Sequence, residues 1–216
     1  SADGVLGHEQ RSMAQPKSFG RGAGEPFESQ ELLAGRIALL GPQDQGEMPA
    51  PASDGAPDMV IELTPVALPE RLRRRQIVVR QDGAQVQMLE QHRWSASLGD
   101  EMQDALSSAL QRRLRAVDMA RGGIAGKPDY RISVEFSRLD ARLGGAVQAE
   151  AAWSVKPTAA TAAQVCLGRF EQQASGAEVS DVVAAHQRVV AQLADAIAAS
   201  VRAAASGTRA TNCAAG

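Results

Sequence analysis

The amino-acid sequence predicts an α/β fold in which two long α-helices cover a mixed β-sheet. Three observations favour this class. Several segments after residue 58 alternate apolar and polar residues, two long stretches place apolar residues three or four positions apart, and the patterns follow the order strands, helix, three strands, helix. With 216 residues and an apolar fraction of 44%, the chain can form one sizeable domain, alone or with appended segments.

The chain begins and ends with segments that differ in composition from the rest. Residues 1–35 are rich in Gly, Ser, Gln and charged residues without a regular period, which predicts a flexible leader or tether. A short strand is expected at 37–40, followed by a loop at 43–57 with several Pro and Gly. The ordered part starts near Asp58, and residues 206–216 are expected to form a polar tail.

Two strand predictions in the first half depend on turn-forming residues. Pro65 interrupts the alternating segment 58–69, so we expect an edge strand or a bulge there. The pair Asp82-Gly83 lies between two apolar runs, at 75–81 and 85–94, and this pair is the strongest short signal for a hairpin. The two runs are therefore expected to pair as antiparallel strands.

Two amphipathic helices are expected. The first begins at the N-cap Ser97 and ends at the Arg-Gly-Gly sequence 121–123, and the second begins at Ser180. The stripes expected to be buried are Leu98, Met102, Leu106, Leu110, Leu114 and Val117 in the first helix, and Val182, Val183, His186, Val189, Val190, Leu193, Ile197 and Val201 in the second.

Between the helices, alternation predicts a meander of three strands. The segments are 129–143, 146–157 and 163–173, and Gly144-Gly145 forms the first turn. In the first strand the residues expected to point inward are Tyr130, Ile132, Val134 and Phe136. The meander therefore supplies most of the sheet that the helices cover.

Composition excludes some classes of protein and leaves the cysteines open. A net charge of -2 argues against a nucleic-acid-binding protein, and no apolar run is long enough to cross a bilayer. Cys166 and Cys213 are too few for a disulfide scaffold. They form one buried thiol and one tail thiol, or a bridge if the compartment is oxidising.

No catalytic, metal-binding or cofactor-binding residues are predicted, so we expect no enzyme. His8, His92 and His186 are far apart in sequence, and a core position explains His186 better than catalysis. The sequence 122–128 resembles a phosphate-binding loop, but it lacks the first glycine and has Pro128 where Ser or Thr is needed.

Four arginines stand directly before the second predicted strand: Arg71, Arg73, Arg74 and Arg75. The simplest interpretation is a solvated turn. Because the adjoining strand is expected to be buried, the fold would also hold these side chains in place. Guanidinium groups pair with the carboxylates of a partner or with the phosphate of a lipid head group.

Several motifs together resemble the PqiC family, the auxiliary lipoproteins of ABC-type lipid transport systems in Gram-negative bacteria. The family signature before the second strand is matched by Leu68, Pro69, Leu72, Arg74, Gln76, Ile77 and Val78, and the joint into the first long helix is matched by Arg93, Trp94 and Leu98. The acidic residue usual before the signature arginine is replaced by Arg73. The resemblance covers residues 36–205, which we expect to be the auxiliary lipoprotein domain.

The resemblance implies both the setting and the architecture of the protein. The layers are expected to resemble those of anticodon-binding domains or of the N-terminal domain of TolB. The family implies a periplasmic domain anchored to the outer membrane through an upstream lipidated cysteine that this chain lacks. It also implies an MCE-domain partner that carries lipid, phospholipid as a ligand, assembly as a homo-oligomer, and no enzymatic role or cofactor.

Three functions are considered. In the first, the domain docks an MCE tunnel protein through the arginines and helps to maintain membrane integrity. In the second, it carries lipid itself in a pocket between the helices and the sheet, where Ala149, Ala151 and Ala196 leave space. These alanines also fit the simpler interpretation of tight helix packing. The third, a hydrolase, lacks a nucleophile with a base placed beside it by the sequence.

Overall fold

A six-stranded mixed sheet forms the centre of the structure, which is a computed structural model. In spatial order its strands are β5 (Ala116–Asp118), β2 (Met59–Leu63), β6 (Tyr130–Ala141), β7 (Ala146–Pro157), β8 (Gln164–Gln173) and β9 (Cys213–Ala215). A second, three-stranded sheet has the order β1 (Arg36–Ile37), β4 (Val86–Trp94) and β3 (Gln76–Arg80). The structure describes residues 36–37, 39, 56–73, 75–80, 85–123 and 125–215.

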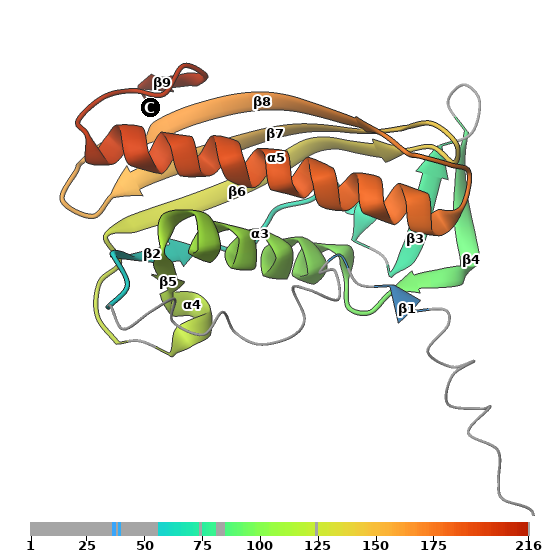
Figure 1. The fold of residues 1–216 in the computed structure, drawn as a ribbon, viewed down its shortest axis with the longest axis horizontal. Helices are drawn as coiled ribbons and strands as arrows, with labels where there is room; N and C mark the ends of the chain where they lie inside the picture. Colours follow the sequence, from blue (N-terminus) through green and yellow to red (C-terminus); the bar gives the residue numbers. More distant parts are fainter. Residues whose placement is uncertain are drawn as a thin grey trace, which may run out of the picture.

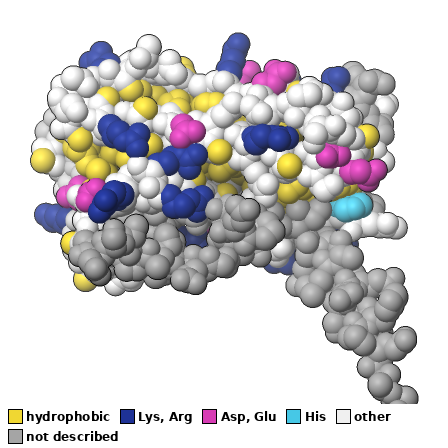
Figure 2. Space-filling model, viewed as in Figure 1, with side chains coloured by type: hydrophobic (Ala, Val, Ile, Leu, Met, Phe, Trp, Pro, Cys, Tyr) yellow, Lys and Arg dark blue, Asp and Glu magenta, His cyan; other side chains and the backbone are white. Residues whose placement is uncertain are grey.

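Two long helices lie side by side over one face of the large sheet (Figure 1). They are α3 (Leu98–Leu114), next to β2 and β5, and α5 (Val179–Ala205), which crosses β7 and β8. Figure 2 shows this face, where basic side chains are interspersed with acidic and apolar ones. The predicted α/β class, with two long helices over a mixed sheet, is confirmed.

The alternation in the meander creates the core. Ile132, Val134 and Phe136 of β6 are at most 3% exposed, and the five inward positions of β7, from Val147 to Val155, are equally buried. All eight residues expected in the stripe of the second helix are buried in α5. Apolar surface removed from water on this scale is the main favourable contribution to folding.

A bulge in β6 changes which face its side chains occupy. Phe136 is paired with Ala151 and Arg138 with Glu150, so Ser137 is an extra residue in the strand. After the bulge Leu139 and Ala141 are the buried positions, whereas Arg138 and Asp140 are half-buried. Two charged side chains are thereby placed on the face opposite the helices.

The first long helix is shorter than predicted. It begins as expected, with the Ser97 hydroxyl accepting a hydrogen bond from the backbone N–H of Asp100, but it ends at Leu114. Arg115 adopts a left-handed conformation with φ of 50°, which stops the helix without a glycine. Val117, expected in the helical stripe, lies in β5, and the sequence 121–123 ends the short helix α4 (Met119–Gly122) instead.

The first predicted strand has a different environment from the one expected. Strand β2 ends at Leu63, before Pro65, and pairs in parallel with β5 on one side and β6 on the other. The prediction of an edge strand was therefore wrong, because the proline lies outside the ladder. The strand expected at 37–40 is limited to Arg36–Ile37 among the described residues.

The predicted hairpin is confirmed, since β3 and β4 pair in antiparallel register. Its turn at Asp82-Gly83 lies outside the described residues. The segment between β2 and β3 runs along β6: the backbone N–H of Ala67 donates to Val134, and that of Phe136 donates to Ala67. Strand β3 then lies beside the far half of β6.

The C-terminal region contains two corrections. The N-cap of α5 is Glu178, which forms a reciprocal capping box with Asp181, whereas Ser180 was predicted. After α5 the chain returns to the sheet, where β9 pairs with β8 and a disulfide joins Cys166 to Cys213. The segment expected to be a polar tail thus contributes a sixth strand, and the bridged alternative for the cysteines applies.

Candidate functional site at the arginine turn

The arginine turn, residues 71–75, is held in place at both ends. It starts in the 3-10 helix η1 (Glu70–Leu72), where the N–H of Leu72 donates to the carbonyl of Pro69 at 2.9 Å. Leu68 and Leu72 are 6% and 5% exposed and anchor this end in the core. At the other end, the N–H of Trp94 donates to the carbonyl of Arg75 at 2.7 Å. The described part of the turn, residues 71–73 and Arg75, therefore presents its side chains from a fixed backbone.

The arginines predicted for this turn differ in their ion-pair partners. Arg71, Arg73 and Arg75 are exposed, and Arg74 lies outside the described residues. Arg73 pairs with Glu70 at 3.0 Å, and both side chains are largely in water, so the pair contributes little to stability. Arg71 instead points to Asp140 of β6, with Nη2 and Oδ1 3.5 Å apart.

Asp140 is the centre of a charged cluster that the sequence did not predict. We call Asp140, Arg71, Arg80 and Arg138 the Asp140 cluster. Arg80 of β3 donates from Nη2 to Oδ1 at 3.0 Å, and Arg138 donates from Nε to Oδ2 at 2.6 Å. The carboxylate is 9% exposed, whereas the arginines are 25% to 44% exposed. Only the bulge in β6 brings these residues together, so no periodic pattern in the sequence indicates them.

The electrostatics of the cluster keep Asp140 ionised. Burial alone would raise the pKa of Asp140, but the hydrogen bonds and charges of Arg138 and Arg80 hold that pKa below its ordinary value of 3.8. In the same way, the hydrogen bond with Asp140 raises the pKa of Arg138. Asp140 therefore stays negatively charged at neutral pH and holds three guanidinium groups.

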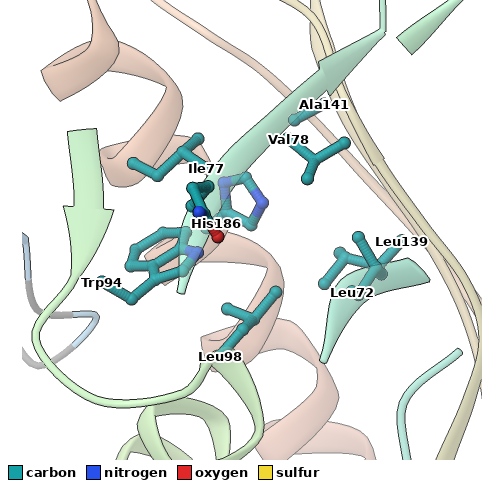
Figure 3. Close-up of a pocket in the computed structure, with 9 residues that line it drawn as sticks. Leu72, Ile77, Val78, Trp94, Leu98, Leu139, Ala141 and His186 are labelled. Atoms are coloured by element: carbon teal, nitrogen blue, oxygen red, sulfur yellow. The ribbon is translucent and has the colours of Figure 1, made fainter. Parts of the chain in front are cut away.

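Several of the other signature residues line a small cavity (Figure 3). Trp94 is 3% exposed and meets His186 edge to face, with ring centres 5.7 Å apart, while Gln76 is half-buried and Arg93 exposed. The cavity is about 10 Å³, enough for no more than one water molecule. Its lining is Leu72, Gln76, Ile77, Val78, Trp94, Leu98, Leu139, Ala141 and His186.

His186 occupies the core position that the sequence favoured. Burial lowers its pKa, and its Nδ1 donates to the carbonyl of Val182 at 2.9 Å. Within the described part of the chain, no three His, Cys, Asp or Glu side chains lie close enough together to hold a metal ion. No described helix is long and apolar enough to span a membrane.

A groove of about 450 Å³ lies beside the arginine turn, between the segment after β2 and the start of α3. Its lining is mainly apolar, and Arg73 contributes to it. The residues are Leu63, Pro65, Val66, Leu68, Arg73, Ser97, Gly99, Asp100, Gln103 and Ala120. This volume lies in the range of small-ligand sites.

Comparisons with known proteins show the family of the chain through a family model, and its fold through solved structures. A family model described as "ABC-type transport auxiliary lipoprotein component" matches residues 39–198. A crystal structure of an uncharacterized protein is similar at a TM-score of 0.58 and 18% identity, over 65% of this chain and 90% of that one. A crystal structure of a Xanthomonas campestris protein of family DUF330 is similar at a TM-score of 0.57 and 12% identity, over 69% of this chain and 87% of that one. No curated protein matches the chain.

Proposed function

Because the chain belongs to the family of ABC-type transport auxiliary lipoprotein components, we propose that it docks an MCE-domain protein of a lipid transport system. In this role it is the non-enzymatic periplasmic domain of a lipoprotein anchored to the outer membrane. The observation that carries the proposal is the arginine turn, where exposed guanidinium groups are held on a fixed backbone. The partner is expected to present carboxylates to this surface.

The turn has two properties that suit a docking surface. Its backbone is ordered by Leu68, Leu72 and the hydrogen bond from Trp94, so binding has little backbone entropy to remove. Arginine is also among the residue types enriched at the energetic centres of protein interfaces. A rigid turn with exposed arginines is therefore expected to contribute more binding energy than its area alone suggests.

The disulfide supports the proposed compartment. Bridges such as Cys166–Cys213 persist in oxidising environments, including the bacterial periplasm, and are rare in the cytosol. The outer-membrane anchor and the homo-oligomeric assembly remain parts of the proposal. Light scattering of the folded domain, alone and mixed with the periplasmic domain of the MCE protein, measures both self-association and complex formation.

The docking surface is tested with charge reversals that leave the Asp140 cluster intact. In Arg73→Glu/Arg75→Glu, both changed side chains are exposed, so the fold should be retained. Arg121→Glu/Arg169→Glu is the matched control, since it changes the net charge equally at exposed positions. We expect immobilised MCE protein to bind the first variant at least about tenfold more weakly and the control normally. Equal capture of the two variants would contradict the docking role.

Direct lipid binding is the second candidate, and the groove beside the turn favours it. The location differs from the one predicted: Ala149 and Ala151 are 1% and 3% exposed, which supports tight packing beneath the helices. The groove offers an apolar lining and Arg73 for a head group. Gly99 lies in the lining, and a Cβ there would meet only ordinary contacts with Ser97 and Leu68.

This position allows a specific test of the carrier role. A leucine at Gly99 should project into the groove, whereas an alanine should be tolerated. If the protein carries lipid there, native mass spectrometry should find lipid with the wild type and Gly99→Ala, and less with Gly99→Leu. Lipid-free wild-type protein, purified without detergent, would exclude the carrier role.

A further inference from the structure

The Asp140 cluster holds more positive charge than one structural ion pair requires. By contrast, Arg131 pairs one to one with Glu62, and Arg121 with Asp104. Here three guanidinium groups share one carboxylate, which leaves an excess of two positive charges among the residues that the structure describes. Glu150 lies 3.9 Å from Arg138 but is also 3.5 Å from Arg169, so including this second pair does not change the excess.

The cluster also has donors beyond those that Asp140 uses. Each guanidinium carries five N–H groups, and the carboxylate has only two oxygens. The Nε of Arg80 is buried and has no hydrogen-bond partner in the part of the chain that the structure describes. A buried donor in this state calls for an explanation such as a bound ion or water. The side chains of Arg71 and Arg138 are 44% and 43% exposed, so a ligand can reach them from solvent.

The three arginines come from separate elements and meet at one place. Arg71 is in η1, Arg80 in β3 and Arg138 in β6 after the bulge. Asp140 stays ionised and reduces the repulsion between them, so the groups are held together before any ligand arrives. A preformed set of converging guanidinium groups is how proteins commonly bind oxyanions.

We propose that the Asp140 cluster binds a phosphate group through Arg71, Arg138 and Arg80. A phosphate monoester carries close to two negative charges at neutral pH, which matches the excess of the cluster. Its oxygens point in several directions and can accept from guanidinium groups that approach from three elements. A single carboxylate of a partner would supply half that charge. The phosphate belongs to a lipid head group or to a free phosphate compound, and this inference is independent of the docking role.

Calorimetric titration with inorganic phosphate tests the site directly. Arg71→Gln/Arg138→Gln removes two of the three groups and leaves Arg80 to pair with Asp140. Arg131→Gln/Arg121→Gln is the control, since it removes the same charge from one-to-one pairs. We expect the first variant to bind phosphate at least about tenfold more weakly, and the control to bind like the wild type at equal ionic strength. Circular dichroism melting establishes that each variant is folded.

Sedimentation with vesicles identifies the source of the phosphate. If the ligand is a lipid head group, vesicles containing phosphatidic acid, whose head group is a phosphate monoester, should carry down the wild type and the control but not Arg71→Gln/Arg138→Gln. Phosphate binding in the calorimeter without vesicle binding assigns the site to a free phosphate compound. The proposal is overturned if the wild type binds neither probe, or if the two variants lose binding equally. It is also overturned if Arg71→Gln/Arg138→Gln loses only the MCE protein, which would indicate an acidic protein surface.

Discussion

Two short segments are attached to the large sheet in opposite ways. Strand β9 is joined to β8 by a disulfide that lies next to Ser200, and the Ser200 hydroxyl accepts a hydrogen bond from Trp153 at 3.0 Å. The segment of η1 and β3 is attached to β6 by buried apolar residues and by the arginines around Asp140. The first attachment is covalent and uncharged. The second leaves excess charge and unused donors that a ligand can occupy.

Because of this contrast, the two attachments should respond to different solution conditions. A disulfide responds to redox conditions but hardly to salt, pH or anions. An ionic cluster with one shared carboxylate responds to all three, because each changes the balance between the guanidinium groups and Asp140. Stability measurements under different conditions should therefore separate the two attachments.

The largest effect is expected when the covalent attachment is removed. Cys213→Ser opens a loop of sequence separation 47 in the unfolded chain, which should lower the free energy of unfolding by about 4 kcal/mol. Urea denaturation measures the loss, which should be the same at low and high salt. Reduced wild-type protein should behave like the variant. A loss below about 1 kcal/mol would mean that β9 contributes little to the fold.

Disrupting the ionic attachment should cause the next largest loss in the free energy of unfolding. Asp140→Asn keeps the shape of the side chain but leaves three arginines without their shared charge. We expect a loss of about 2 kcal/mol, less than for a fully buried pair because the arginines reach water. The matched change is Asp195→Asn, whose partner Arg113 links the two helices. Asp195 is 67% exposed, so its loss should stay below about 1 kcal/mol.

Added salt should affect the stability of the two variants, Asp140→Asn and Cys213→Ser, differently. Screening weakens repulsion among the exposed arginines, so added salt should restore part of the stability of Asp140→Asn. It should not restore that of Cys213→Ser. If the free energy of unfolding of Asp140→Asn does not change with salt, Asp140 acts through packing alone.

Lowering the pH should lower the free energy of unfolding through His186. Burial lowers the pKa of His186 in the folded state below the ordinary 6.5, so the unfolded chain binds more protons than the folded protein. Stability is therefore complete above pH 6.5 and falls as the pH drops below it, by at most about 1.4 kcal/mol per unit. Denaturation between pH 7 and about pH 5 should show this slope, and His186→Phe should remove it. The carboxylate of Asp140 titrates only below 3.8, outside that range.

Regular periods and local signals in the sequence predicted much of the fold. Alternation identified β6 and β7, three-to-four spacing identified the buried stripe of α5, and a hydroxyl before an acidic turn identified Ser97 as a cap. The end of α3 was missed because Arg115 adopts a left-handed conformation that only a glycine would have signalled. Strand β9 has three residues, too few for any period.

The sequence predicted only the part of the candidate site that a local pattern reveals. The arginine turn is a visible run of like charges, and Arg71 reaches the cluster. Arg80 and Arg138 were missed because their common partner depends on a bulge and on β3 lying beside β6. These are tertiary facts, since nothing local in the sequence relates position 80 to position 140.

The smallest effect on stability is expected at Arg73, and this makes it the most informative position for function. Its pair with Glu70 is 63% and 84% exposed, so Arg73→Gln should change the free energy of unfolding by only a few tenths of a kcal/mol. Thermal melting in parallel with capture by the MCE protein tests both properties on one sample. A clear loss of capture with unchanged melting would separate binding from folding at the turn. If melting falls by as much as it does for Asp140→Asn, Arg73 supports the fold, and the contrast between an exposed binding residue and a structural cluster does not hold.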